Sequence, residues 1–327
     1  MLYYELAKKI INGEQVPFKT ALALINTSDA DTFLLLAAAN EIKNHFKGNK
    51  VKLCAIVNAK SGKCSENCSF CAQSSHHKTG AQAYPLMAPD EMVKAAKSSE
   101  KDMKATCFSI VTSGKSVFSE NEMLAIGSAV GTISSETDLN RCVSLGTLSG
   151  QQIRELKSRG LKRLHHNLES AESFFDNICT THTYKERLDT IKSAKSEGLE
   201  VCSGGIFGLG ESLEQRVELA ITLSELGVES VPINILNPIA GTPAAAHFIP
   251  VKPLEALRLV ATYRFILPKA DIGIFGGREK TLRELQPLMF IAGANVTLVG
   301  NYLTTKGQDA SRDLQMISDL GLEIDRR

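Results

Sequence analysis

The chain has 327 residues, of which 43% are hydrophobic and 22% charged, a composition that excludes intrinsic disorder and suffices for one large domain or two smaller ones. Its 37 lysine and arginine residues nearly balance 36 aspartate and glutamate residues, so we expect a small ligand and no nucleic-acid partner. Charged and polar residues interrupt residues 1–15, which contain no continuous apolar run, and no later segment reaches about 18 uninterrupted apolar residues, so we expect no membrane association and a cytoplasmic location.

Residues 1–50 are predicted to form a helical N-terminal extension, because apolar residues recur there at helical spacing. From residue 51 onward, β-rich runs alternate with amphipathic helical stretches. The expected strands are 51–57, 104–111, 138–146, 161–169, 199–208, 229–236, 270–277 and 294–300. The expected helices are 89–99, 119–130, 149–160, 184–198, 212–227, 252–266, 281–293 and 309–321. Eight such pairs predict an α/β protein with a (βα)8 TIM-type barrel over residues 51–327; a doubly wound open sheet is the alternative.

Three of the eight cysteines, Cys64, Cys68 and Cys71, follow the first predicted strand with C-x3-C-x2-C spacing. In a reducing compartment cysteines indicate metal binding or catalysis rather than disulfides. In a barrel this position is the rim where active sites form. Three thiolates leave one iron of a [4Fe-4S] cluster open to another ligand. The alternative is a structural zinc site completed by His76 or His77, which the rim position disfavours.

Four more cysteines, Cys54, Cys107, Cys142 and Cys202, each lie within a different predicted strand. Because side chains alternate along a strand, all four could converge inside the barrel and form a second metal site. Read singly, each is a small buried hydrophobic residue. Cys179 remains, and we expect it to serve packing or to act as a reserve ligand.

The three-cysteine loop, with Phe70 directly before the third cysteine, resembles the radical S-adenosylmethionine superfamily. The stretches CVSLGTLS, HHNLE, TYKERLDTI, VCSGGIFGLGE, ESVPIN, GREK, AGAN and LTT, in this order, narrow the resemblance to the biotin synthase family. It implies a radical-generating [4Fe-4S] cluster, S-adenosylmethionine, dethiobiotin as substrate, an auxiliary iron-sulfur cluster, an electron donor protein and a homodimer. It also assigns roles to individual residues. The expected cofactor-binding residues are Phe70, Asn167, Glu169, Arg187, Ile206 and Leu209, and the expected substrate-binding residues are His165, Asn167, Asn234, Thr304 and Thr305.

The sequence departs from the family at the auxiliary cluster. The family pattern has three strand cysteines, matching Cys107, Cys142 and Cys202, with an arginine from the seventh strand, where this chain has Gly273. Cys54 stands where a serine is typical. We therefore expect an all-cysteine site that holds a four-iron cluster, with a [2Fe-2S] cluster as the alternative. Two other functions stay open, namely another radical S-adenosylmethionine enzyme (a maturase or a mutase) and a non-catalytic iron-sulfur carrier.

Overall fold

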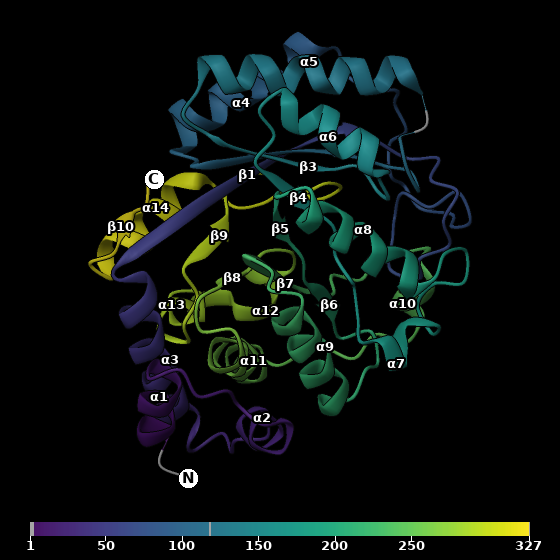
Figure 1. Cartoon of the computed structure of the whole chain (residues 1–327). Coiled ribbons are helices and arrows are strands. Elements are labelled where there is room, and N and C mark those ends of the chain that lie inside the picture. Colours follow the sequence, from purple (N-terminus) through teal and green to yellow (C-terminus); the bar gives the residue numbers. More distant parts are fainter. Residues whose placement is uncertain (1–2, 118, 327) are drawn as a thin grey trace.

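The computed structural model describes residues 3–117 and 119–326, and it is built around a curled parallel sheet (Figure 1). The strands are β1 (Lys50–Lys60), β2 (Cys107–Thr112), β3 (Asn140–Ser144), β4 (Arg163–His165), β5 (Glu200–Cys202), β6 (Gly205–Phe207), β7 (Ser230–Ile235), β8 (Asp271–Ile274), β9 (Val296–Leu298) and β10 (Glu323–Ile324). Strands β1 to β5, β7 and β8 pair in parallel in this order, and β9 pairs with the other edge of β1. This is the predicted TIM-type barrel.

Helices cover the outside of the sheet. They are α1 (Tyr3–Ile11), α2 (Phe18–Ile25), α3 (Thr32–Lys47), α4 (Pro89–Met103), α5 (Glu120–Glu136), α6 (Gly150–Ser158), α7 (Glu172–Phe175), α8 (Tyr184–Ser196), α9 (Leu213–Glu225), α10 (Pro243–Ala246), α11 (Pro253–Ile266), α12 (Arg278–Leu282), α13 (Leu288–Ile291) and α14 (Ala310–Asp319), with a 3-10 turn at Arg283–Leu285. Within the described residues, no helix has the length and apolarity needed to cross a bilayer.

One expected helix, 281–293, is broken into α12, the 3-10 turn and α13. Pro287 has no N–H to continue a helix, and Arg283 has a left-handed backbone with φ of 51°. The fifth expected strand is likewise divided into β5 and β6, both of which pair with β7.

Close backbone approach explains that division. A Cβ atom on Gly204 would lie 2.0 Å from the carbonyl oxygen of Pro232, and one on Gly205 would lie 2.6 Å from that of Glu169. Glycine is therefore required where β4, β6 and β7 pass each other.

The ring of strands closes between β8 and β9 through Asn295, which is buried. Its backbone N–H donates to the carbonyl oxygen of Ile272 (2.8 Å), and its side-chain Oδ1 accepts from the N–H of the same residue (3.0 Å). Its Nδ2 donates to Asp271 (2.7 Å), and Arg264 donates to its Oδ1 (2.8 Å). Side-chain hydrogen bonds thus replace part of a strand ladder here.

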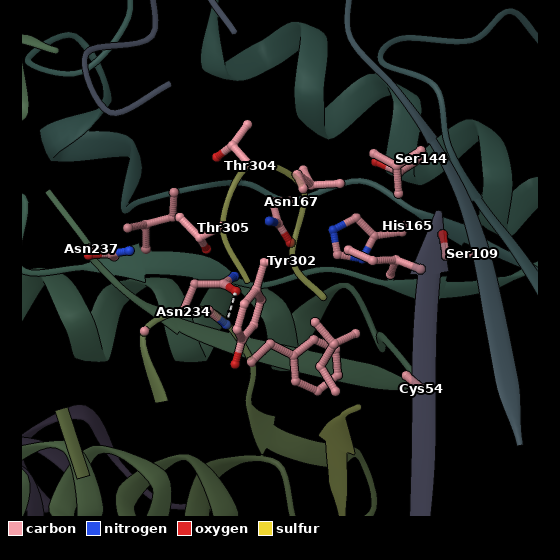
Figure 2. A pocket seen from close by; sticks show the side chains of 18 of the residues that line it. Cys54, Ser109, Ser144, His165, Asn167, Asn234, Asn237, Tyr302, Thr304 and Thr305 are labelled. Atoms are coloured by element: carbon pink, nitrogen blue, oxygen red, sulfur yellow. Dashed lines mark hydrogen bonds between the residues drawn. The ribbon is translucent and has the colours of Figure 1, made fainter. Parts of the chain in front are cut away.

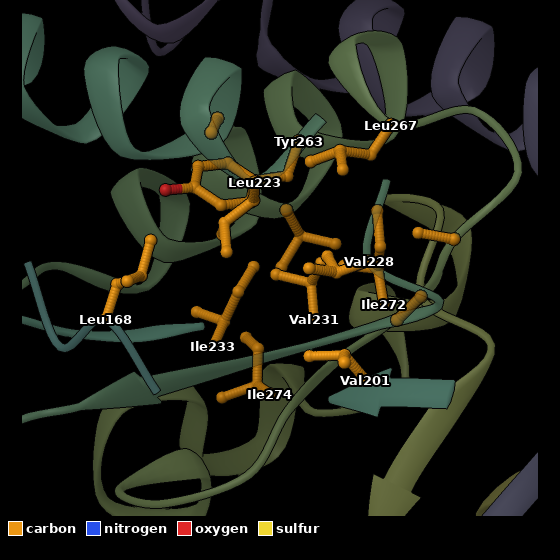
Figure 3. Packing of buried hydrophobic residues seen from close by; sticks show 14 of the residues in the cluster. Leu168, Val201, Leu223, Val228, Val231, Ile233, Tyr263, Leu267, Ile272 and Ile274 are labelled. Carbon is orange, nitrogen blue, oxygen red and sulfur yellow. The ribbon is translucent and has the colours of Figure 1, made fainter. Parts of the chain in front are cut away.

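Strand alternation separates the two faces of the barrel wall. Val231 and Ile233 on β7, and Ile272 and Ile274 on β8, are fully buried in the main core, which extends to α9 and α11 (Figure 3). The intervening residues face the barrel interior. Apolar packing between the strands and the outer helices therefore stabilises the barrel wall. The side chains that point to the interior do not have to form this core, and they can be polar or contain sulfur.

Candidate active site

The three rim cysteines lie on a loop that folds back on itself. Cys64 donates its N–H to the carbonyl oxygen of Gln73 (3.0 Å), Ser75 donates to that of Cys64 (2.8 Å), and Cys71 donates to that of Cys68 (3.0 Å). These bonds fold the segment that carries the three cysteines into one loop after the carboxyl end of β1. Such a loop fits a cluster held by three thiolates.

The two histidines after this loop are occupied with other contacts. The Nε2 atom of His76 lies 2.9 Å from the carbonyl oxygen of Ser65, and that of His77 lies 3.0 Å from the carbonyl oxygen of Cys68. A carbonyl can only accept, so both Nε2 atoms carry protons and donate. The histidines therefore fasten the loop. Among the described residues, no group of three ligand atoms within 4.8 Å of one another includes either histidine, so the zinc alternative has no assembled site.

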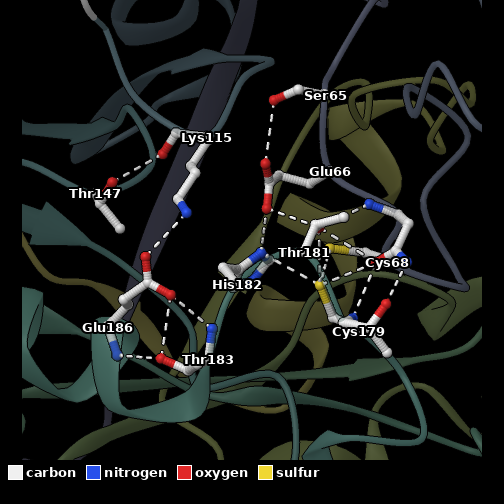
Figure 4. Close-up of polar contacts among 12 residues, drawn as sticks. Ser65, Glu66, Cys68, Lys115, Thr147, Cys179, Thr181, His182, Thr183 and Glu186 are labelled. Carbon is white, nitrogen blue, oxygen red and sulfur yellow. Dashed lines mark hydrogen bonds and ion pairs between the residues drawn. The ribbon is translucent and has the colours of Figure 1, made fainter.

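Cys179 lies directly against the rim loop (Figure 4). Its Sγ is 3.7 Å from Cys68 Sγ and 3.2 Å from the Nδ1 atom of His182, which in turn lies 2.5 Å from Glu66. Cys68 donates this hydrogen bond, which lowers the pKa of Cys179 to about 3 and raises that of Cys68. The contact with Cys68 itself was not predicted, because 111 positions separate the two cysteines.

These side chains could be mistaken for a metal site, since Cys68, Cys179 and His182 offer ligand atoms within 4.8 Å of one another. The guanidinium of Arg187, however, donates from Nε to the Nε2 atom of His182 (3.0 Å). The imidazole must then carry its proton on Nδ1, which donates to the Glu66 carboxylate and is not free to coordinate. We interpret the group as a hydrogen-bond network that supports Cys68.

A cavity of about 330 Å³ occupies the barrel interior (Figure 2). Of the residues singled out from the sequence, those that line it are Cys54, Phe70, Cys71, Cys107, Cys142, His165, Asn167, Glu169, Cys202, Ile206, Asn234, Thr304 and Thr305. Cys64, Cys68, Arg187 and Leu209 are not part of its lining. Residues that the sequence did not indicate also line it, among them Ser109, Arg163, Phe275 and Tyr302.

The four strand cysteines lie together at the inner end of this cavity. Cys54 on β1 and Cys107 on β2 are register partners, and Cys142 on β3 pairs with Ser109 on β2. Val296, Leu298, Phe275 and Tyr302 pack around Cys54, Cys107 and Cys142. A hydrogen bond with Cys107, followed by burial, raises the pKa of Cys54. Burial raises the pKa of Cys142, and it raises that of Cys202 to about 12. The hydrogen bond with Cys54 lowers the pKa of Cys107. The three thiols with a raised pKa become thiolates only if a cation or a metal compensates their charge, so the donor set fits an iron-sulfur cluster.

Gly273 on β8 cannot be replaced by a residue with a side chain in this backbone. A Cβ atom there would lie 1.8 Å from the carbonyl oxygen of Val296 on the adjacent strand. A ligand from this position is therefore excluded sterically.

The side chain of His165 lines the cavity and also contacts one of the strand cysteines. Its Nδ1 is 3.3 Å from the Sγ of Cys202, its register partner on β5. Burial, followed by the charges of Arg163 and Arg187, lowers the pKa of His165 to about 4. Its imidazole is therefore neutral at neutral pH and can donate one hydrogen bond.

Polar groups near the rim surround the opposite end of the cavity. Asn167 accepts from the N–H of Gly204 (3.1 Å) and donates to Glu169 (3.3 Å). Arg187 donates to the carbonyl oxygen of Asn167 (2.8 Å) and lies 3.6 Å from Glu169. Burial raises the pKa of Glu169 although Arg187 opposes the shift. Leu209 packs against the main core and not on the cavity.

Asn234 on β7 and the segment after β9 form the remaining wall. The Oδ1 atom of Asn234 accepts from the N–H of Gly276 (2.9 Å), and its Nδ2 donates to the carbonyl oxygen of Gly205 (3.3 Å). One N–H and one lone pair therefore remain for a ligand. Thr304 and Thr305 add two hydroxyl groups (Figure 2).

Comparison with known proteins agrees with this arrangement. Residues 59–223 match the model of the radical SAM superfamily, and residues 232–323 match that of the biotin and thiamin synthesis associated domain. Methylornithine synthase shares the fold with a TM-score of 0.85 at 19% identity, covering 98% of this chain and 97% of that one. The hydrogenase maturase HydG gives 0.83 at 17% identity, covering 99% of this chain and 75% of that one. The chain is thus a barrel of the radical S-adenosylmethionine class.

The curated relatives define the family more narrowly. A biotin synthase of Geotalea uraniireducens is 50% identical over 317 residues, which cover 97% of this chain and 96% of that protein. A biotin synthase of Pelotomaculum thermopropionicum is 47% identical over 324 residues, 99% of this chain and all of that protein. The chain belongs to the biotin synthase family.

Proposed function

We propose that the chain converts dethiobiotin to biotin by radical insertion of sulfur. The observation that carries this proposal is the single cavity, which has rim Cys71 at one end, four strand cysteines at the other and hydrogen-bonding groups between them. When loaded, the rim cluster with S-adenosylmethionine supplies a primary carbon radical, and the auxiliary cluster supplies sulfur. An unactivated C–H bond needs such a radical, since acid-base chemistry does not break it at neutral pH.

The residues of the chain hold and orient the two small molecules. Arg187 fits the methionine carboxylate of S-adenosylmethionine, and Glu169 fits its ribose hydroxyls. Asn167 fixes the position of Arg187 relative to the β6 side of the site, because it is hydrogen-bonded to both Arg187 and Gly204. Phe70 and Ile206, which line the cavity, complete the proposed cofactor site, whereas Leu209 packs behind it against the core.

On the substrate side, the remaining N–H of Asn234 matches the carbonyl oxygen of a neutral ureido ring. Thr304 and Thr305 offer hydroxyls for the substrate carboxylate. His165, between Asn167 and Cys202, places a neutral donor where the substrate meets the auxiliary site. Apolar Ile56, Phe275 and Leu298 close this region against water, which protects a radical.

For the auxiliary site we propose four cysteine ligands, Cys54, Cys107, Cys142 and Cys202, and a four-iron cluster. Two features support it: Cys54 and Cys107 are register partners, and Gly273 leaves no room for a ligand from β8. Cys64, Cys68 and Cys71 hold the radical-generating cluster.

The reaction also requires an external one-electron donor, which we propose to be a protein. By family resemblance we propose a homodimer, which light scattering coupled to gel filtration tests. A cytoplasmic location is proposed because free thiols of two clusters require a reducing compartment.

The activity is tested by anaerobic incubation of reconstituted protein with reductant, S-adenosylmethionine, sulfide and dethiobiotin, followed by mass spectrometry. Biotin together with 5′-deoxyadenosine is the expected result. Cys71→Ala should form neither product, whereas Cys142→Ala should form 5′-deoxyadenosine alone. If wild-type protein cleaved the cofactor without forming biotin, the substrate assignment would be wrong, and if it cleaved nothing, a carrier function would be favoured.

A further inference from the structure

Arg163 is the one lysine or arginine among the described residues that line the cavity. It is the first residue of β4, and its register partners are Cys142 on β3 and Glu200 on β5. Because paired positions of neighbouring parallel strands direct their side chains to the same face, Arg163 and Cys142 are neighbours inside the barrel. Its side chain is 4% exposed.

The guanidinium is anchored from one side only. Its Nε and Nη2 atoms donate to one oxygen of Glu200 at 3.0 and 2.7 Å. Across residues 3–117 and 119–326, its Nη1 atom has no hydrogen-bond partner. Glu200 is 46% exposed, so the carboxylate that fixes the guanidinium stays in contact with solvent.

A cluster held by four thiolates would place net negative charge in a site where all four cysteines are buried. Burying charge without a partner is costly, and hydrogen bonds to cluster sulfurs and nearby charge set reduction potentials. The chain has no side chain at position 273 to provide such a partner. The cation that the fold does place beside these cysteines comes from β4.

We infer that Arg163 is the cationic partner of the auxiliary cluster, donating from Nη1 to its sulfur atoms while Glu200 holds the guanidinium in place. It acts as a positioning and charge-compensating residue, not as an iron ligand, because a guanidinium paired with a carboxylate keeps its proton. This inference rests on the proposed auxiliary site, whichever number of irons that site holds.

The test compares the wild-type enzyme, reconstituted with both clusters, with Arg163→Met, Arg163→Gln and Arg163→Lys. The auxiliary signals are first assigned by their loss in Cys142→Ala. The midpoint potential of the auxiliary cluster is then measured by anaerobic titration with electron paramagnetic resonance, and its iron loss to a chelator is timed. The radical-generating cluster serves as an internal reference in every sample.

We expect Arg163→Met and Arg163→Gln to move the midpoint potential of the auxiliary cluster to a more negative value, because a positive charge that favours the reduced cluster is lost. We also expect the auxiliary cluster to lose iron about tenfold faster, since a partly desolvated charge interaction shifts an equilibrium by about one pKa unit, which is a factor of ten. Arg163→Lys, which keeps the charge, should lie close to wild type, and the midpoint of the radical-generating cluster should not move. Either neutral variant suffices if the other fails to fold.

The inference is overturned if the neutral variants match wild type, or if Arg163→Lys shifts the auxiliary midpoint as far as Arg163→Met does, which would indicate packing instead of charge. Wild-type protein without any auxiliary signal would contradict the proposed function itself. These two failures are therefore distinguishable.

Discussion

Cys54 is the residue that distinguishes an all-cysteine auxiliary site from a three-cysteine one. It is buried, faces its register partner Cys107, and sits in a cluster whose other neighbours are apolar.

Replacing Cys54 by serine keeps the size of the side chain but removes a soft sulfur ligand. We expect the auxiliary-cluster absorption and biotin formation to be lost, and 5′-deoxyadenosine formation to stay within about threefold of wild type, because the rim loop is not touched. Absorption spectroscopy and product analysis measure both. Unchanged iron content and unchanged biotin formation in Cys54→Ser would exclude Cys54 as a ligand.

Residues adjacent in a motif were predictable, and strand alternation also predicted that the four strand cysteines face one interior, but single contacts made by the fold were not predictable. Cys64, Cys68 and Cys71 follow one strand, so their spacing indicates a shared loop. Arg163 and Cys179 meet their partners through strand register and loop packing, which no local pattern encodes. The placement of Arg187 and Leu209 outside the cavity lining could likewise not be predicted from the motifs that contain them.

Among the elements, β8 and β9 approach each other closely at Gly273, which has no side chain. We expect Gly273→Ala to destabilise the protein by about 1–3 kcal/mol or more, since the added Cβ overlaps the carbonyl oxygen of Val296. Urea unfolding measures this. Gly80→Ala is the matched control, because a Cβ there meets nothing within 4 Å. Equal stability of the two variants would contradict the tight contact.

The same edge of the barrel is tied to the N-terminal extension by Asp271. Its carboxylate accepts from Lys47 of α3 (2.9 Å) and from Lys52 of β1 (2.9 Å). Burial lowers the pKa of Lys47. Burial alone would raise the pKa of Asp271, but the two ammonium groups outweigh it and hold that pKa well below the ordinary value of 3.8.

Because the pKa of Asp271 is lower in the folded protein than in the unfolded chain, the ionised carboxylate stabilises the fold. This stabilisation is complete above the pKa of the unfolded chain and is lost progressively as the pH falls below that value. We expect Asp271→Asn to cost about 1.5–3 kcal/mol near neutral pH and the difference from wild type to shrink between about pH 5 and about pH 3. Urea unfolding of cluster-free protein at each pH measures it. A difference that stayed constant with pH would show that the carboxylate charge is not responsible.

Strand and helix order could be predicted because hydrophobic periodicity alternates so regularly after residue 50. The break within 281–293 could not, because the apolar spacing there is helical and only Pro287 and the backbone of Arg283 interrupt it. The closure of the strand ring by Asn295 could not be predicted either, because it depends on hydrogen bonds with Ile272 and Arg264, which are distant in the sequence.

At the scale of the whole molecule, the barrel alone does not decide the reaction. Methylornithine synthase and HydG share this fold at 17–19% identity. In this chain, five cysteines from a rim loop and four strands line one cavity. We propose that radical generation and sulfur supply share this cavity.

The most direct test of this account is the iron and sulfide content per chain after anaerobic reconstitution, with Mössbauer spectroscopy to distinguish the cluster types. Two four-iron clusters predict about eight irons per chain, with Cys54→Ser losing the auxiliary share. About six irons with a two-iron spectrum would contradict the all-cysteine four-iron site, and about four would contradict the existence of a second cluster in the barrel.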